Sequence, residues 1–265
     1  MSKSEATSDG GTGGTGLPAS IEAAWGLRGR PARGPKPGLS LERIVDAGIT
    51  VASAEGLGAV SMSRVAAEVG ASTMALYRYV EAKDELLALM VDAAYGRPPD
   101  FEPSGGDWRE GLSRWAWAEL HAVLRHPWAL RVPMTGPPVT PNQIAWLEQG
   151  LRCLGPTKLA ESEKLSTILL LSGYVQRWAT LATDLGELAG TPAAESDPDA
   201  GEPADDGTAY WLALARIIDP ERFPAVTAVL TSELAGEGPD DFLAEFVFGL
   251  ERVLDGIEAL VNQRS

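Results

Sequence analysis

The chain has 265 residues, of which 45% are hydrophobic, and it carries a net charge of −15. A chain of this length and composition can bury one large core or two modest ones, which excludes an intrinsically disordered protein. Its single cysteine, Cys153, excludes an intramolecular disulfide and fits a reducing cytoplasm, and no apolar run is long enough to span a membrane.

The first 38 residues predict a flexible leader that ends in a basic arm. The stretch "MSKSEATSDGGTGGTGLPAS" is rich in Gly, Ser and Thr and lacks the apolar core of a signal peptide. The arm "RGRPARGPKPG" follows and contains four cations, Arg28, Arg30, Arg33 and Lys36. From Arg28 to Lys83 the net charge is +3, so the rest of the chain carries −18. A basic N-terminal region on an acidic body is typical of proteins that contact nucleic acid.

Helical periodicity dominates the segment that follows, and no strand-like alternation of any length is present. The helices expected from serine N-caps and terminating glycines run from Ser40 to Gly56, from Ser61 to Gly70, from about Thr73 to Tyr79, and onward from near Lys83. Leu76 and Val80 are expected to anchor the third helix inward. Residues 39–84 therefore predict a small three-helix domain.

The second and third of these helices, with Gly70 between them, have the form of a helix-turn-helix, whose second helix enters the major groove of DNA. The side chains expected to face outward are Thr73, Met74, Tyr77 and Arg78. A hydroxyl, an apolar tip, a phenol and a guanidinium suit thymine methyls, phosphates and guanine edges. Arg64 is placed to reach a base or a phosphate, and the basic arm to follow the backbone or enter the minor groove. The alternative is a packing element whose aromatics only cover the core.

The stretch "LSLERIVDAGITVASAEGLGAVSMSRVAAEVGASTMALYRYVEAKDELL", residues 39–87, resembles the N-terminal domain of the tetracycline-repressor (TetR) family of transcriptional regulators. The resemblance implies phosphate and base contacts for Ser63 and Arg64, and base contacts for Thr73 and Met74. It implies phosphate contacts for Tyr77 and Lys83, with Tyr79 beside them. Arg78 stands where an aromatic residue is common in the family.

One position departs from that pattern. Relatives place Ser or Asn before the lysine of "KDELL" as an N-cap, and this chain has Ala82. Alanine leaves the first amides of the helix without a side-chain acceptor, at a cost of roughly 1 kcal/mol. Asp84 and Glu85 compensate in part through the helix dipole. We therefore predict a loose joint between the helix-turn-helix and the helix that begins near Lys83.

Residues 85–265 predict a larger helical regulatory domain, which makes the whole chain all-α. After the linker "RPPDFEPSGGD", the expected helices are Trp108–Arg125, Pro127–Val132, Asn142–Cys153, Glu161–Leu188, Thr208–Ile218, Ala225–Leu234 and Asp240–Asn262. Residues 189–207 are acidic, rich in Pro and poor in apolar side chains, which predicts a mobile loop.

The segments "GDWREGLSRWAWAELHAVLRHPWAL" and "PNQIAWLEQGLRCLG" are similar to the regulatory domain of the branch that includes the tetracycline repressors themselves. The resemblance implies a homodimer held by a four-helix bundle, to which each chain contributes residues 161–188 and 240–262. A symmetric operator requires two recognition helices about one turn of the DNA apart, roughly 34–36 Å. The alternative is that both apolar stripes are intramolecular core.

The body contains most of the eight tryptophans, and the resemblance favours a small-molecule pocket among them. The candidate ligand-binding residues are Trp115, Glu119, His126, Trp128, Trp146, Tyr174, Arg177 and Trp178. A charge inside an aromatic cluster needs a partner, so Arg177 and Glu119 are expected either to pair or to bind the ligand. For any single tryptophan, an ordinary place in the core is the competing interpretation.

The ligand is not expected to be a magnesium–tetracycline complex. Counted without gaps from Trp108, the position of the family's metal-ligating histidine is occupied by Pro133, and His121 and His126 are the only histidines. No cofactor or metal is therefore predicted, and a bulky hydrophobic or aromatic compound is the expected inducer.

No catalytic motif is present, which argues against an enzyme. The sequence predicts a cytoplasmic, ligand-responsive regulator that binds operator DNA as a dimer and is released by its ligand. The alternatives are a regulator that answers to a protein or to cell state, and a binding protein without DNA. The mechanism expected is repression through a palindromic operator, and activation is the alternative that the sequence leaves open.

Overall fold

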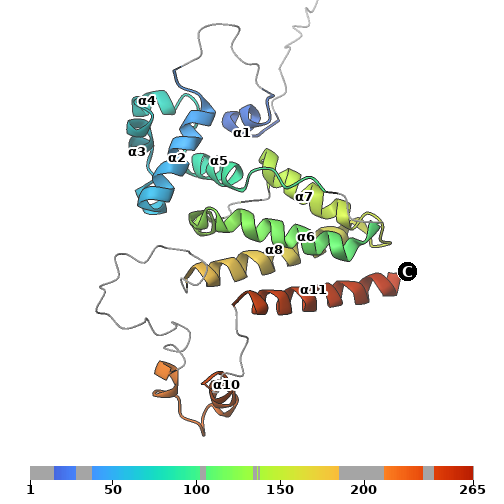
Figure 1. Ribbon diagram of the computed structural model, residues 1–265. Helices are drawn as coiled ribbons and strands as arrows, with labels where there is room; N and C mark the ends of the chain where they lie inside the picture. Colours follow the sequence, from blue (N-terminus) through green and yellow to red (C-terminus); the bar gives the residue numbers. More distant parts are fainter. Residues whose placement is uncertain are drawn as a thin grey trace, which may run out of the picture. The chain divides into compact units, whose positions relative to one another are not determined.

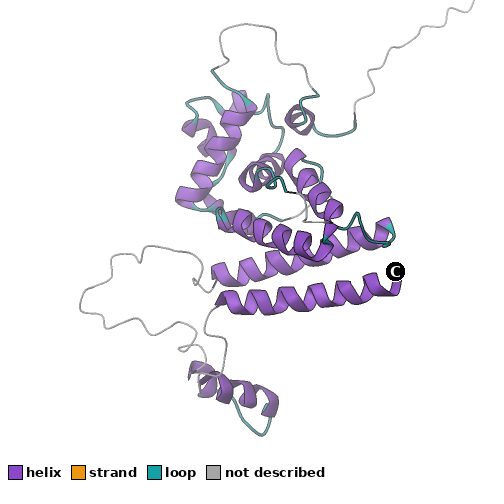
Figure 2. Ribbon diagram, turned by 45° about the vertical axis from the view of Figure 1, so that its right-hand side comes forward, coloured by secondary structure: helices purple, strands orange, loops and turns teal. Residues whose placement is uncertain are grey.

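The computed structural model describes residues 15–27, 38–101, 106–133, 136, 138–184, 212–234 and 242–264. Every regular element in these ranges is a helix (Figures 1 and 2), which confirms the predicted all-α fold. No helix within the described ranges combines the length and the apolar character needed to cross a bilayer. The chain divides into two compact units: residues 1–96 with 131–145, and residues 97–130 with 146–265.

Unit 1 contains the helix-turn-helix. Its helices are α1 (Ala19–Ala24), α2 (Leu41–Glu55), the 3₁₀ turn η1 (Leu57–Ala59), α3 (Met62–Glu68), α4 (Thr73–Leu76) and α5 (Lys83–Tyr95). Ser40 and Ser61 cap α2 and α3 as predicted, since each hydroxyl accepts a hydrogen bond from the amide three residues later. Ile44, Val65, Leu76 and Met90, from four different helices, are fully buried and form the centre of this core.

Helix α1 belongs to the segment predicted as a flexible leader, and the structure corrects that prediction for residues 15–27. Ile21 of α1 is 2% exposed. The Ser20 hydroxyl donates to Glu85 Oε1 of α5 at 2.5 Å, and the Trp25 indole N–H donates to the Val139 carbonyl at 2.8 Å. The pattern gave little sign of this helix because it is only six residues long, and distant side chains hold it. Residues 1–14 and 28–37 lie outside the described ranges.

Residues 131–145 join unit 1 through Asp92 of α5. Its carboxylate accepts hydrogen bonds from the amides of Asn142 at 2.9 Å and Gln143 at 3.0 Å, the first free N–H groups of α7 (Pro141–Cys153). Asp92 is therefore an N-cap supplied by another helix. The predicted domain boundary at residues 84/85 differs from the structure, because α5 packs on α2 and belongs to the same unit as the helix-turn-helix.

Unit 2 is built on three long helices that pack on one another: α6 (Trp108–Leu124), α8 (Glu161–Asp184) and α11 (Phe242–Arg264). α8 and α11 lie side by side along much of their length (Figures 1 and 2). Leu112, Leu171, Phe246 and Leu250 are at most 1% exposed and fill the space between the three helices. The predicted helices match these three with end shifts of a few residues.

Ion pairs of Arg109 and Arg264 connect α11 to α6 and to α8. Arg109 of α6 forms ion pairs with Glu251, Asp255 and Glu258 of α11, and Arg264 of α11 pairs with Glu163 of α8 at 2.7 Å. The hydrogen bonds with Asp255 and Glu251 raise the pKa of Arg109 against the opposing effect of desolvation. These pairs lie along the outer edges of the bundle and orient α11.

The remaining elements are shorter. The helix predicted at Pro127–Val132 is the 3₁₀ helix η3 (Pro127–Arg131), and α10 covers Pro224–Leu234. Of the predicted helix Thr208–Ile218, residues 212–215 are helical. The predicted acidic loop, residues 189–207, lies outside the described ranges.

Candidate DNA-binding surface and ligand-binding core

The recognition helix α4 begins after a tight turn. Gly70 has φ +69°, a left-handed conformation that suits glycine, and the Ser72 hydroxyl then accepts a hydrogen bond from the Ala75 amide. Past Leu76 the hydrogen bonds shorten to the i→i+3 pattern, from Arg78 to Ala75 and from Tyr79 to Leu76. The predicted third helix is therefore one α-helical turn that continues into tighter turns.

The two faces of α4 separate as predicted. Leu76 and Val80 are 0% exposed, whereas Met74 is 73% and Tyr77 45% exposed. Thr73 is half-buried and Arg78 exposed. Met74 and Tyr77 lie three residues apart and are both exposed, so one face of the recognition segment is free to contact another surface.

Arg64 of α3 is held by two carboxylates. Its Nη2 lies 2.6 Å from Glu55 Oε1, and its Nη1 lies 2.8 Å from Glu68 Oε2. The hydrogen bond with Glu55, followed by that with Glu68, raises the pKa of the guanidinium. Arg64 must leave this clamp before it can contact a phosphate or a base. The pair with Glu68 follows the i,i+4 spacing and is readable from the sequence, whereas Glu55 lies nine residues away on another helix and no local pattern reveals it.

Tyr79 has a structural partner. Its hydroxyl donates to the Leu39 carbonyl at 3.0 Å, just before α2 begins, and the ring is half-buried. This bond ties the end of the recognition segment to the start of α2. The geometry gives Tyr79 a packing role, which differs from the DNA contact that the resemblance implied.

The other predicted DNA contacts occupy different settings. Ser63 and Lys83 are exposed, and the Ser63 hydroxyl lies 3.2 Å from that of Ser61. The arm residues Arg28, Arg30, Arg33 and Lys36 fall outside the described ranges.

The start of α5 lacks a side-chain cap at Ala82, as predicted. Glu85 supplies other contacts: its Oε2 accepts the Glu81 amide at 2.6 Å, and its Oε1 accepts the Ser20 hydroxyl. Glu85 thus links the turn before α5 to α1, in a variant of the capping box. These contacts hold the start of α5 in place and so argue against a loose joint. They do not measure its mobility, so the loose joint stays a prediction.

The predicted ligand residues of unit 2 fall into separate groups. Trp115 and Trp146 meet edge to face, with ring centroids 6.1 Å apart, and the Trp115 indole N–H donates to the Trp146 carbonyl. His126 and Trp128 are paired at 5.9 Å. Burial, aided by the charge of Arg125, lowers the pKa of His126.

The third group surrounds Phe246 of α11, which was predicted only as part of an apolar stripe. The rings of Trp178, Tyr174 and Trp117 lie 4.9, 5.5 and 4.8 Å from that of Phe246. The sequence missed Phe246 as the shared neighbour of Trp117, Tyr174 and Trp178. These rings come from three helices that are far apart in the sequence, so no local pattern reveals the contacts.

Of the two alternatives for Glu119 and Arg177, the mutual pair is contradicted by the structure, and ligand binding by these residues stays a prediction. Arg177 is exposed, whereas Glu119 is 4% exposed and its Oε1 accepts hydrogen bonds from Ser172 at 2.6 Å and Gln176 at 3.2 Å. Residues 172 and 176 are one turn apart on the face of α8 toward α6, and residue 177 lies about 100° further round. Desolvation raises the pKa of Glu119. Its Oε2 is buried with no hydrogen-bond partner among the described residues.

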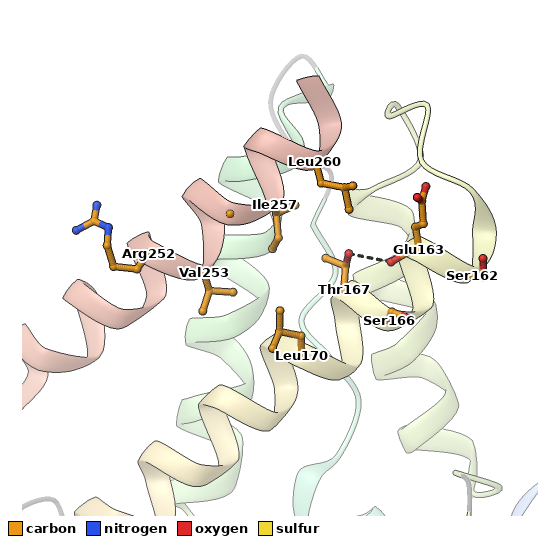
Figure 3. A pocket seen from close by; sticks show the side chains of 10 residues that line it. Ser162, Glu163, Ser166, Thr167, Leu170, Arg252, Val253, Ile257 and Leu260 are labelled. Atoms are coloured by element: carbon orange, nitrogen blue, oxygen red, sulfur yellow. Dashed lines mark hydrogen bonds between the residues drawn. The ribbon is translucent and has the colours of Figure 1, made fainter. Parts of the chain in front are cut away.

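An open groove of about 580 Å³ runs between α8 and α11 (Figure 3). Leu170, Val253, Ile257 and Leu260 form its apolar floor, and Ser162 and Arg252 lie toward its edges. Further apolar side chains are exposed along the same two helices: Leu165 at 41%, Leu169 at 61%, Leu170 at 59%, Leu181 at 41%, Val247 at 42% and Phe248 at 66%. Such a large apolar surface is typical of an interface.

The chain is similar to known regulators along nearly its whole length. Residues 44–90 match the family "Bacterial regulatory proteins, tetR family", and residues 99–261 match the "Tetracyclin repressor-like, C-terminal domain". The HTH-type transcriptional repressor DrrR1 of Streptomyces coeruleorubidus is 37% identical over 97% of this chain and 95% of its own length. An HTH-type transcriptional regulator of Saccharopolyspora erythraea is 32% identical over 53% of this chain and 59% of its own length.

Solved structures agree with this assignment. The TetR family protein ActR of Streptomyces coelicolor, in complex with actinorhodin, has a TM-score of 0.65 at 26% identity and covers 84% of this chain and 98% of its own. ActR in complex with (S)-DNPA gives the same TM-score at 23% identity. With a matched DNA-binding domain, a matched C-terminal domain and a full-length relative, the chain belongs to the TetR family of bacterial transcriptional regulators, which bind DNA and are not enzymes.

Proposed function

We propose that the chain is a cytoplasmic repressor that binds a palindromic operator as a homodimer and releases it when a hydrophobic or aromatic small molecule binds unit 2. The observation that carries the DNA-binding part is the division of the recognition segment into two faces. Leu76 and Val80 are fully buried, and Met74 and Tyr77 are exposed beside Thr73 and Arg78. Repression is favoured because the relative of nearly equal length is a repressor.

The dimer is supported by the apolar surface of α8 and α11. Leu169, Leu170 and Phe248 are each about 60% exposed or more on these helices, and the groove between them has an apolar floor. Two helices from each chain would form a four-helix bundle that covers these side chains. Arg109 and Arg264 orient α11, which suits a surface that must match its copy.

The ligand-binding part is supported by the chemistry of the unit 2 core. Aromatic rings cluster between α6, α8 and α11, and Glu119 has one buried oxygen that meets no hydrogen-bond partner in the described part of the chain. A buried polar atom without a partner is costly, and a ligand with a hydrogen-bond donor or acceptor would satisfy it. ActR was solved in complex with actinorhodin, so a related fold accommodates a bound ligand.

Operator binding by Tyr77→Ala tests the proposal. Tyr77 is 45% exposed next to α4, so its loss should weaken operator affinity by about 10- to 100-fold, as expected for an interface contact of roughly 1–3 kcal/mol. Fluorescence anisotropy with operator DNA from the flanking intergenic sequence measures the change. The logarithm of the association constant should also fall by several units per tenfold rise in salt for the parent chain.

Tyr79→Phe is the matched control, because it removes only the hydroxyl that bonds to the Leu39 carbonyl. It should leave operator affinity within a few-fold of the parent. If Tyr77→Ala binds DNA as well as the parent does, the recognition surface is misplaced. If neither the parent nor Tyr79→Phe shows salt-dependent DNA binding, the chain is a small-molecule binding protein that does not bind DNA.

A further inference from the structure

The buried hydroxyl of Ser20 in α1 donates a hydrogen bond to a carboxylate of α5. Ser20 is 2% exposed, and its hydroxyl lies 2.5 Å from Glu85 Oε1, although the two residues are 65 positions apart in the chain. Burying a hydroxyl costs free energy unless it finds a partner, and a carboxylate oxygen is a strong acceptor. This bond therefore fixes the position of the Glu85 side chain as well as that of Ser20.

Glu85 connects Ser20 to the turn that precedes α5. Its other oxygen, Oε2, accepts a hydrogen bond from the Glu81 amide at 2.6 Å. Glu81 directly follows Val80, the fully buried residue that ends the recognition segment, residues 73–80. Both oxygens of Glu85 belong to one planar group, so the bond from Ser20 sets the direction in which the carboxylate meets the Glu81 amide.

The turn depends on Glu85 because α5 has no side-chain cap at Ala82. A serine or asparagine at that position would bond to the first amides of the helix and hold the turn locally. A glutamate side chain loses rotamer freedom when it takes up one position, and the bond from Ser20 offsets part of that loss. α1 thus supplies a constraint that the sequence around residue 82 lacks.

α1 has other attachments besides the Ser20 hydroxyl. Ile21 is 2% exposed, and the Trp25 indole N–H donates to the Val139 carbonyl at 2.8 Å. Removing the hydroxyl of Ser20 therefore leaves α1 docked, and its effect on the turn can be separated from the loss of the helix.

We propose that Ser20 is a positioning residue for operator binding. It holds Glu85, and Glu85 holds the turn at Glu81, which keeps the recognition segment in the orientation that DNA requires. This inference rests on the proposed function as an operator-binding protein. In this role Ser20 acts only through Glu85.

The first test is made without DNA. Ser20→Ala removes the donor, so hydrogen exchange of the Glu81 amide, followed by NMR on the full chain, should become about 3- to 10-fold faster, the range that one hydrogen bond supplies. Thr15→Val is the matched control, because it removes a hydroxyl whose bond, to Glu22 at 2.8 Å, stays within the same segment. It should leave the exchange rate of Glu81 unchanged.

The second test is operator affinity, measured by fluorescence anisotropy. Ser20→Ala should weaken it by about 3- to 10-fold and leave the slope of log K against log salt unchanged, because no phosphate contact is lost. In the Glu85→Ala background the same Ser20→Ala change should have no effect, since its target is absent. Comparing two chains within that background cancels the effect of the lost negative charge.

Three results would overturn the inference while the parent chain binds its operator. One is an unchanged exchange rate of Glu81 in Ser20→Ala, and another is an unchanged operator affinity of that variant. The third is an equal loss of affinity with and without Glu85, which would mean that Ser20 does not act through Glu85. A parent chain that binds no operator would instead overturn the proposed function and, with it, the role of Ser20 in DNA binding.

Discussion

Beside α4 in unit 1 the side chains of Met74 and Tyr77 face solvent, whereas in unit 2 the rings of Trp117, Tyr174 and Trp178 pack around Phe246. Met74 is 73% exposed, and Phe246 is 0% exposed. A short helix can present such side chains only if a few residues hold it firmly, and Leu76 and Val80 do so here. In unit 2 the rings that would contact a ligand also pack against one another. Replacing any one of them would therefore change the stability of the chain as well as ligand binding.

Removing the ring at the centre of unit 2 should have the largest effect. Phe246→Ala deletes a buried side chain that touches Trp117, Tyr174 and Trp178, so the free energy of unfolding should fall by about 3–5 kcal/mol. Chemical denaturation followed by tryptophan fluorescence measures the loss.

Phe248→Ala is the matched control on the same helix. Phe248 is 66% exposed and lies near Arg252, so its loss should change the stability of one chain by less than about 1 kcal/mol. If α11 forms the dimer interface, the effect of Phe248→Ala should instead grow as the protein is diluted. An equal, concentration-independent loss for both variants would contradict the assigned faces of α11.

How much the sequence predicts differs between the two regions for a physical reason. In unit 1 the caps Ser40 and Ser61, the turn at Gly70 and the anchors Leu76 and Val80 act within one helix or across one turn, so local patterns predict them. The ion pair of Arg64 with Glu55, the bond from Tyr79 to Leu39 and the docking of α1 join residues from different elements. These contacts depend on tertiary packing, which periodicity does not specify.

In unit 2 the helix boundaries were predictable, but the neighbours of each ring were not. The resemblance suggested that Glu119 and Arg177 share a site. One step of about 100° along α8 decides that Gln176, and not Arg177, faces Glu119. A rotation of this size cannot be read from a helix that carries apolar residues on several sides.

Glu119 offers a pH test of the buried core. Desolvation raises its pKa in the folded chain, so the folded state keeps the proton to a higher pH than the unfolded state does. Stability should therefore fall as pH rises from about 4.5, the ordinary value for the group, through the raised pKa. Glu119→Gln cannot ionise, so its stability relative to the parent should increase over that window in denaturation experiments.

Glu163 supplies the opposite sign as a control. The hydrogen bond from Arg264 lowers its pKa, so its contribution is present above the ordinary pKa and is lost as pH falls through the lowered one. The difference between Glu163→Gln and the parent should therefore shrink in acid. If Glu119→Gln and Glu163→Gln show the same pH trend, Glu119 is not desolvated in the folded chain.

The smallest expected effect concerns the exposed face of unit 1. Glu55 and Glu68 each form an ion pair with the Arg64 guanidinium, so Arg64 would exchange these partners for a phosphate on binding DNA. Exposed ion pairs of this kind are weak and are screened by salt, so the clamp can open when DNA approaches. In the double variant Glu55→Gln with Glu68→Gln, Arg64 has lost both of these ion pairs before DNA binds. Operator affinity should rise several-fold, and the dependence of log K on log salt should steepen by about one unit if Arg64 takes a phosphate.

Removing two negative charges near DNA raises affinity by itself, so the control must change charge equally. Glu42→Gln with Asp46→Asn does so at two exposed positions on α2 that do not hold Arg64. Only the Glu55 and Glu68 variant should steepen the salt dependence, because only there does a cation gain freedom to replace a counterion. Equal slopes for the two double variants would mean that Arg64 stays off the backbone, and the recognition surface would then rest on α4 and Lys83 without help from α3.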